Sequence, residues 1–395
     1  MPGASMSGIS GSTEPTESTM DEQSDVTHLL KSQPYYTTRK GAAYQGDSRE
    51  LLEELPEGEV DLIVTSPPFA LRREKAYGNE SPEEYNEWFM EFAEKAYDVL
   101  ADDGSMVIDI GGGWTKGVPT RSTYHFELLM DLVGEDGPFH LAQEMYWYNP
   151  AKLPTPAQWV TIERIRLKDA VNHVWWLSKT ERPDADNKRV LKEYSDAQKK
   201  LMEDGYKDKM RPSEHNISDK FDKPKEDGAI RPNFWDMVDS PDIAPDFSDI
   251  LHDAGVSDEL IQSAAEVDKL DELARLTLPE DKIPDNVLKI ANTASNTHYL
   301  NACKEVGVDP HPARFPRDLP QFFIQFLTEK DDLVLDIFAG SNMSGWLAEQ
   351  MGRDWLAFEY QEKYLRSSKL RFLPMEELQR DDNQQSFDDV IELTD

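Results

Sequence analysis

One short segment of the sequence, "TSPPF" at 65–69, combines residue types that could do chemistry on an amine. It follows an apolar run, and strand-forming residues that lead into Pro-Pro indicate a strand that ends abruptly. Ser66 supplies an acceptor oxygen. The Pro67 carbonyl is fixed in direction, Pro68 has no competing N–H, and Phe69 offers a face for stacking a planar ring. Such a loop could accept both hydrogens of an exocyclic amine and hold the amine in line for reaction. A plain strand-terminating turn is the alternative.

A second segment, "DLVLDIFAGSNMSG" at 332–345, has the pattern of a ligand-binding turn. A buried strand ends at Asp336, a glycine-containing turn follows, and a helix begins. In open α/β sheets ligands bind at the carboxyl ends of strands, where a glycine lets the backbone approach them. The glycine spacing of a dinucleotide site and the Gly-Lys-Ser/Thr of a P-loop are both missing. The turn therefore suits a ligand with an amine and a sugar, and Glu359, at the end of the next strand, could bind ribose hydroxyls.

The elements that must position these segments alternate along the chain. Expected strands cover 42–47, 61–66, 104–112, 172–179, 332–340 and 354–360, and expected helices cover 48–55, 81–100, 125–133, 319–328 and 342–352. We expect Ser48 and Ser81 to cap the first two helices. Strands that alternate with helices predict an α/β fold, in which a parallel or mostly parallel sheet is covered on both faces.

Composition limits the class of protein. The chain has 395 residues, enough for one large domain with additions or for two domains. Its one cysteine, Cys303, excludes an intrachain disulfide and a cysteine-based zinc cluster. No apolar run reaches membrane-spanning length, and the Ser/Thr-rich start reads as a disordered lead rather than a signal peptide. We therefore expect a cytoplasmic protein without a membrane segment or a metal.

The net charge of −35, from 42 Lys and Arg against 77 Asp and Glu, has two interpretations. Taken alone it argues against nucleic acid, since DNA binding requires cations that neutralise phosphates. The other interpretation is a halophilic organism, whose salty cytoplasm screens the repulsion between acidic groups.

The charge is unevenly distributed. Residues 152–231 contain 18 bases and 15 acids, a net charge of +3, whereas residues 236–288 contain 15 acids and 3 bases, a net charge of −12. The first block is where a polyanion contact is expected. Within it, Arg164, Arg166 and Lys168 alternate and could face phosphates from one side of a strand, or simply face solvent. Arg211 lies in a polar segment that could include base-reading side chains.

These observations divide the chain into six expected regions. They are a disordered lead (1–33), a catalytic half (34–150), a target-recognition region (151–235), an acidic helical insertion (236–288), a cofactor-binding half (289–374) and an acidic tail (375–395).

The two motifs, and further segments such as "WYNPAKLPTPAQWV" and "HPARFPRDLPQFFIQFLTE", resemble beta-class DNA cytosine-N4 methyltransferases of restriction–modification systems. The likeness runs from about 36 to about 374 and is strongest to members that modify CAGCTG; the acidic block at 236–288 departs from it. It implies a Rossmann-like, circularly permuted methyltransferase fold that binds S-adenosylmethionine. The implied catalytic residues are Ser66, Pro67, Pro68 and Phe69. The implied cofactor-binding residues are Asp47, Thr65, Phe315, Asp336, Phe338, Ala339, Gly340, Ser341 and Glu359.

The resemblance also implies the reaction. A methyl group would pass from S-adenosylmethionine to the N4 amine of a cytosine flipped out of double-stranded DNA. A cognate restriction endonuclease would be a functional partner, and the enzyme could act as a monomer. An adenine-N6 enzyme of the same fold remains the alternative, although Ser66 favours cytosine. A cytosine-C5 mechanism needs a cysteine nucleophile, and Cys303 lies in a helix-like stretch. An acidic cofactor-binding module without catalysis is the third hypothesis.

Overall fold

The computed structural model describes residues 26–70, 84–148, 152–192, 194–204, 228–236, 296–373 and 378. Their strands form a nine-stranded sheet in the order β1-β2-β9-β8-β3-β4-β6-β5-β7. The strands are β1 (Tyr36–Thr37), β2 (Gly41–Gln45), β3 (Val60–Thr65), β4 (Leu100–Ile110), β5 (His140–Tyr148), β6 (Val171–Ser178), β7 (Phe234–Asp236), β8 (Leu333–Asp336) and β9 (Asp354–Glu359). The α-helices are α1 (Ser48–Glu54), α2 (Tyr85–Val99), α3 (Tyr124–Val133), α4 (Asp196–Asp204), α8 (Thr297–Glu305), α9 (Asp318–Leu327), α10 (Met343–Gln350) and α11 (Glu362–Ser368).

The central strands β2, β9, β8, β3 and β4 are parallel, which confirms the expected α/β sheet. At one edge β1 pairs antiparallel with β2, and at the other β6 is antiparallel to both β4 and β5. The sequence analysis did not predict β5, because the strand begins with exposed residues and lacks a regular alternation of apolar side chains.

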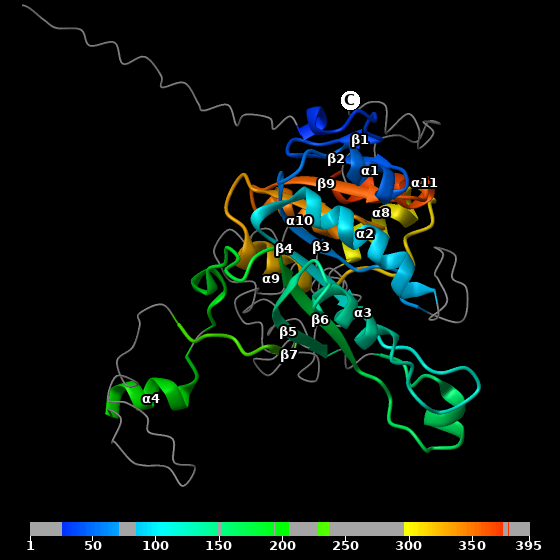
Figure 1. The fold of residues 1–395 in the computed structure, drawn as a ribbon, viewed down its shortest axis with the longest axis vertical. Helices are drawn as coiled ribbons and strands as arrows, with labels where there is room; N and C mark the ends of the chain where they lie inside the picture. Colours follow the sequence, from blue (N-terminus) through cyan, green and yellow to red (C-terminus); the bar gives the residue numbers. More distant parts are fainter. Residues whose placement is uncertain are drawn as a thin grey trace, which may run out of the picture.

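Helices cover both faces of the sheet (Figure 1). Side chains of α1, α2 and α3 pack with alternate strand residues such as Ile63 and Trp175 on one face. Side chains of α9, α10 and α11 pack with Leu62, Val64 and Trp176 on the other. Neighbouring strand residues point to opposite faces, so the continuous apolar runs of these strands are buried on both sides. Trp175 and Trp176 are therefore core residues, one on each face.

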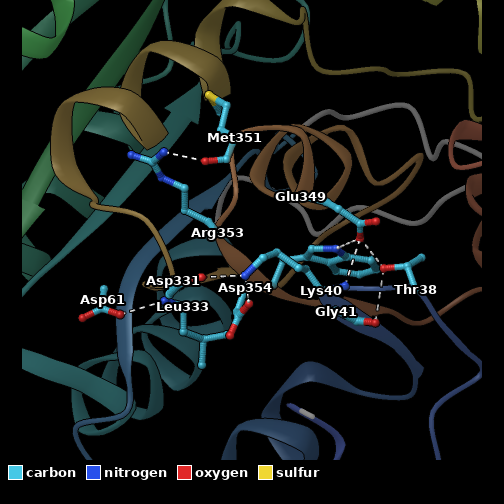
Figure 2. Close-up of polar contacts among 11 residues, drawn as sticks. Thr38, Lys40, Gly41, Asp61, Asp331, Leu333, Glu349, Met351, Arg353 and Asp354 are labelled. Atoms are coloured by element: carbon cyan, nitrogen blue, oxygen red, sulfur yellow. Dashed lines mark hydrogen bonds and ion pairs between the residues drawn. The ribbon is translucent and has the colours of Figure 1, made fainter. Parts of the chain in front are cut away.

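The first and last parts of the chain meet in the sheet. The N-terminal strand β2 pairs in parallel with the C-terminal strand β9, with Ala43 opposite Ala357. Figure 2 shows polar contacts that join these parts at the strand beginnings: the buried Lys40 ammonium contacts Asp331 at 2.7 Å and Asp354 at 3.0 Å. This pairing is the arrangement that a circular permutation requires, with the strand before "TSPPF" in the middle of the sheet.

Two helix starts differ from expectation. Asp47, not Ser48, caps α1, because its carboxylate accepts the Arg49 N–H at 2.9 Å, whereas the Ser48 hydroxyl donates to the Ile337 carbonyl at 2.6 Å. The helix expected from 81 begins at Tyr85 in the described residues, and Ser81 lies outside them. None of the described helices is long and apolar enough to cross a membrane.

Candidate active site

A cavity of about 740 Å³ lies at the carboxyl ends of the parallel strands, where the sequence analysis placed the ligand. This volume is within the range of small-molecule sites in proteins. Its wall combines the loop after β3, the turn after β8 and the segment before α9. The predicted site residues on this wall are Asp47, Ser66, Pro67, Pro68, Phe69, Phe315, Phe338, Ala339, Gly340, Ser341 and Glu359.

Asp336 does not line the cavity; it lies beneath the turn and is buried. Its carboxylate accepts hydrogen bonds from the Thr65 hydroxyl at 2.8 Å, the Ser344 hydroxyl at 2.7 Å and the Phe338 N–H at 3.1 Å. Burial raises the pKa of Asp336 to about 6. Thr65 is also fully buried and outside the wall. In this structure both predicted residues hold the two loops together, and neither faces the cavity.

The turn after β8 depends on one glycine. Gly340 has φ +52°, and a Cβ at this position would lie 3.2 Å from the His311 ring. Its N–H donates to Glu359 at 2.9 Å. Ser341 is held by Arg371, a buried guanidinium whose Nη2 donates to the Ser341 hydroxyl at 2.8 Å. The turn is therefore fixed from three sides, with its backbone against the cavity.

Glu359 stands where a ribose-binding acid is expected, at the end of β9 and on the cavity wall. It accepts the N–H groups of Gly340 and of Gln361, the latter at 2.8 Å. Burial raises its pKa to about 7. Each carboxylate oxygen has a further lone pair that a sugar hydroxyl could approach.

Two other wall residues already have protein partners. Both carboxylate oxygens of Asp47 accept hydrogen bonds from the Arg49 guanidinium, at 3.0 and 2.6 Å. A contact between Asp47 and an adenine amine would therefore have to form in addition to this ion pair. The His311 backbone N–H donates to the Tyr299 hydroxyl oxygen at 2.9 Å, and the ring Nδ1 pairs with the Ala313 carbonyl. Burial lowers the pKa of His311 to about 4, so the ring is neutral near pH 7.

The loop after β3 contacts a buried carboxyl group that the sequence analysis did not single out. The Ser66 hydroxyl donates to Asp109 Oδ2 at 3.1 Å, and the Asn172 amide donates to Asp109 Oδ1 at 3.1 Å. Lys152 Nζ donates to the Asn172 oxygen at 2.9 Å. Asp109 is 3% exposed, and burial raises its pKa to about 6. The chain of contacts from Lys152 to Ser66 lies in the wall of the cavity.

Phe69 reaches the cavity because a glycine makes room for its ring. A Cβ on Gly111 would lie 2.5 Å from the ring. Asp109 and Gly111 both belong to "IDIGGG", at the end of β4. A single acid in the buried apolar end of the strand, Met106–Ile110, was the signal that could have identified Asp109. Asn172 and Lys152 carried no such signal, since β6 and the segment after β5 bring them together only in the fold.

The predicted DNA contacts are less regular than expected. Arg164, Arg166 and Lys168 are exposed but do not lie on a strand; the segment is irregular, and Arg164 has φ 56°. The prediction of a strand was wrong because this stretch hydrogen-bonds to the turn of helix at Gln158–Ile162 instead of to another strand. Arg211 lies outside the described residues, as does most of the acidic insertion.

A doubly wound, circularly permuted sheet with this cavity has the fold of S-adenosylmethionine-dependent methyltransferases. The chain belongs to the N6/N4 DNA methyltransferase family, whose model, described as DNA methylase, matches residues 60–370. S-adenosylmethionine is the cofactor of this family, and the donor set fits it: Glu359 for ribose hydroxyls, aromatic walls for the adenine, and a glycine turn for close approach.

Individual relatives agree with the family. The chain is 44% identical over 343 residues to the type II methyltransferase M.PvuII of Proteus hauseri. The aligned region covers 86% of this chain and 86% of the relative. It is 32% identical over 114 residues to M.ScaI of Streptomyces caespitosus, covering 29% of this chain and 36% of the relative. The solved structure named PvuII DNA methyltransferase (cytosine-N4-specific) superposes with a TM-score of 0.61 and 37% identity, covering 92% of this chain and 95% of that one.

Proposed function

We propose that this protein transfers a methyl group from S-adenosylmethionine to the N4 amine of a cytosine flipped out of duplex DNA. The observation that carries the proposal is the meeting of residues 66–69 of one motif and residues 337–341 of the other on the wall of one cavity. The high identity to a relative whose structure is named cytosine-N4-specific supports N4 over adenine N6.

The chemistry assigned to Ser66 follows from its hydrogen bond. The lone pair of an exocyclic amine is delocalised into its ring, so the amine is a weak nucleophile. Because the Ser66 hydroxyl donates its hydrogen to Asp109, its oxygen lone pairs point elsewhere and can accept an amine hydrogen. The Pro67 carbonyl is the second acceptor, and Phe69 stacks on the base. S-adenosylmethionine, when bound, supplies the electrophilic methyl group.

The amine must also lose a proton when its new bond to carbon forms. Ser66 can take that proton while its own hydrogen moves to Asp109, so that the charge is neutralised inside the protein. A buried carboxyl with a pKa of about 6 is ionised at neutral pH and is a better proton acceptor than an ordinary aspartate. Asn172 fixes the orientation of Asp109. Arg164, Arg166, Lys168 and Arg211 are proposed DNA contacts.

The biological role is proposed from the same relatives. Type II methyltransferases are half of restriction–modification pairs, so this enzyme would protect host DNA from a cognate endonuclease. A palindromic site such as CAGCTG needs no dimer, because each strand can be methylated in a separate event.

The test is mass spectrometry of nucleosides from a methylation-deficient host that expresses the protein. We expect N4-methylcytosine with the wild type, and a loss of about a hundredfold or more with Ser66→Ala, because the acceptor that orients the amine is removed. Ser195→Ala, an exposed serine outside the cavity, is the matched control and should leave methylation unchanged. Finding N6-methyladenine alone would refute the choice of base.

A further inference from the structure

An arm formed by two segments, residues 111–122 and 152–170, is attached to the rim of the active-site cavity. The first segment begins at Gly111, directly after Ile110, the last residue of β4. The second precedes β6, whose Asn172 lines the cavity, as Asp109 of β4 does. In Figure 1 this green and cyan part extends well beyond the strand ends, at the lower right. Anything that enters the cavity from that side passes the arm.

The two segments of the arm pack against each other. The rings of Trp114 and Trp159, one from each segment, have centroids 5.6 Å apart, and the Arg121 guanidinium lies 5.4 Å from the centre of the Trp114 ring. Arg121 also forms an ion pair with Asp169. The Ile165 N–H donates to the Trp159 carbonyl at 2.9 Å. These contacts hold the 164–168 stretch in one conformation before any partner arrives.

The outer surface of the arm is unusually apolar. Five of the ten exposed large hydrophobic side chains in the described residues belong to it: Val118, Leu153, Ile162, Ile165 and Leu167. Leu167 is 89% exposed, the largest fraction among the ten, and Ile165 is 53% exposed. Single exposed apolar side chains are common, but several gathered on one projecting segment mark a surface that binds a partner.

The arm is also positively charged in an acidic protein. Its basic residues are Lys116, Arg121, Lys152, Arg164, Arg166 and Lys168, and its acidic residues are Glu163 and Asp169. Six bases against two acids give a net charge of +4, whereas the whole chain has −35. In "RIRLK", at 164–168, cations alternate with the two aliphatic side chains. A partner that fits this pattern has closely spaced negative charges around an apolar interior, which describes the phosphates and stacked bases of a duplex.

We propose that Leu167, supported by Ile165, is a wedge that enters the duplex beside the target cytosine and fills the space that the flipped base leaves. The proposal rests on the proposed function, since a wedge is needed only if the base leaves the stack. Flipping breaks pairing and stacking, and an apolar side chain in the gap compensates for part of that loss. The neighbouring cations hold the phosphates on either side, and Leu167 acts by positioning the base, without touching the reacting atoms.

The test compares the full-length wild type with Leu167→Ala on two duplexes. Both carry the cytosine that the wild type methylates, once paired with guanine and once in a mismatch, which is already partly unstacked. We expect kcat/KM of L167A to fall about tenfold or more on the paired duplex, and to stay within about twofold of wild type on the mismatched one, because the mismatch lowers the cost of flipping. Fluorescence of 2-aminopurine placed at the target position should show less flipping by L167A on the paired duplex.

Two variants serve as controls. Leu141→Ala removes another exposed leucine, at the end of β5 that lies away from the cavity, and should not change either rate. Leu167→Met, which keeps an apolar side chain of similar size, should restore most of the activity on paired DNA. The wedge would be overturned if kcat/KM of L167A were unchanged on both duplexes or reduced equally on both. It would also be overturned if L167A changed the self-association of the protein in the absence of DNA. A wild type that leaves cytosine unmodified would count against the proposed function and, with it, the wedge.

Discussion

Burial sets the acidity of three carboxyl groups at this site, and within the described residues none of the three has an ion pair with a cation, in contrast to Asp47 with Arg49. Asp109, Asp336 and Glu359 all have raised pKa values, and desolvation is the main cause for each. Their hydrogen-bond partners are hydroxyls, an amide and backbone N–H groups, which favour the ionised form without cancelling its charge. Perturbed carboxyls of this kind concentrate at functional sites, because catalysis needs proton acceptors that titrate near neutral pH.

The role of Asp109 can be tested by its pH dependence. Only the ionised form can accept the Ser66 proton, so kcat should fall as the pH drops through about 6, the pKa of this group. Asp109→Asn should lower kcat by about a hundredfold or more at pH 8 and abolish the acidic limb of the profile. Cofactor affinity, measured by calorimetry, should not change. An acidic limb that persists in D109N would assign it to another group.

At the scale of elements, the start of α10 joins the cofactor turn to the rest of the fold. Asn342, the residue before the helix, has a left-handed backbone with φ 51°, and its side-chain oxygen accepts the Gly345 N–H at 3.0 Å. Its amide also donates to the Tyr36 hydroxyl at 2.9 Å, in the first strand. A short polar side chain is among the few that tolerate this backbone and can cap the helix as well.

Replacing Asn342 should therefore destabilise the protein through two separable effects. Asn342→Ala loses the cap and strains the left-handed backbone, and we expect the free energy of unfolding to fall by about 2–3 kcal/mol. Asn342→Gly loses the same side chain without the backbone strain, so its loss should be smaller by about 1 kcal/mol. Chemical denaturation of both variants measures the difference, and equal losses would show that the backbone conformation costs nothing.

At the scale of the whole molecule, different parts of the surface charge affect DNA binding and folding stability. The basic arm at the cavity rim can contact DNA. The rest of the chain carries a net charge of −39, since the arm's +4 is included in the total of −35, and it repels both DNA and itself. Whether the acidity reflects a halophilic origin stays a prediction from the sequence. The physical consequence does not depend on the organism.

We expect the protein to become more stable with salt, because counterions screen the repulsion between its acidic groups. The melting temperature at pH 7.5 should rise between roughly 0.1 M and 2 M KCl. Near the isoelectric point of about 4.5 the same addition should have a much smaller effect, which provides the control. Duplex affinity should decrease over the same range, since phosphate contacts weaken with salt. A melting temperature that does not respond to salt at pH 7.5 would contradict the argument.

The sequence by itself determined the parallel sheet, the order of its motifs and the residues of the two loops. These features are local: an apolar run, a Pro-Pro stop and a glycine turn act within a few residues. It also misplaced local details, such as the cap of α1 and a strand at 164–168, where neighbouring segments offered better hydrogen-bond partners.

Only the tertiary structure decided which side chains meet. Ser66 and Asp109 lie 43 positions apart, and their contact depends on the parallel pairing of β3 with β4. Asp109 and Asn172 lie 63 positions apart, and their contact depends on the antiparallel pairing of β6 with β4, which no local pattern encodes. The same holds for Asp336, which the sequence placed at the ligand and the fold turned toward Thr65 and Ser344. Residue types set what chemistry is available, but long-range packing sets which groups are close enough to use it.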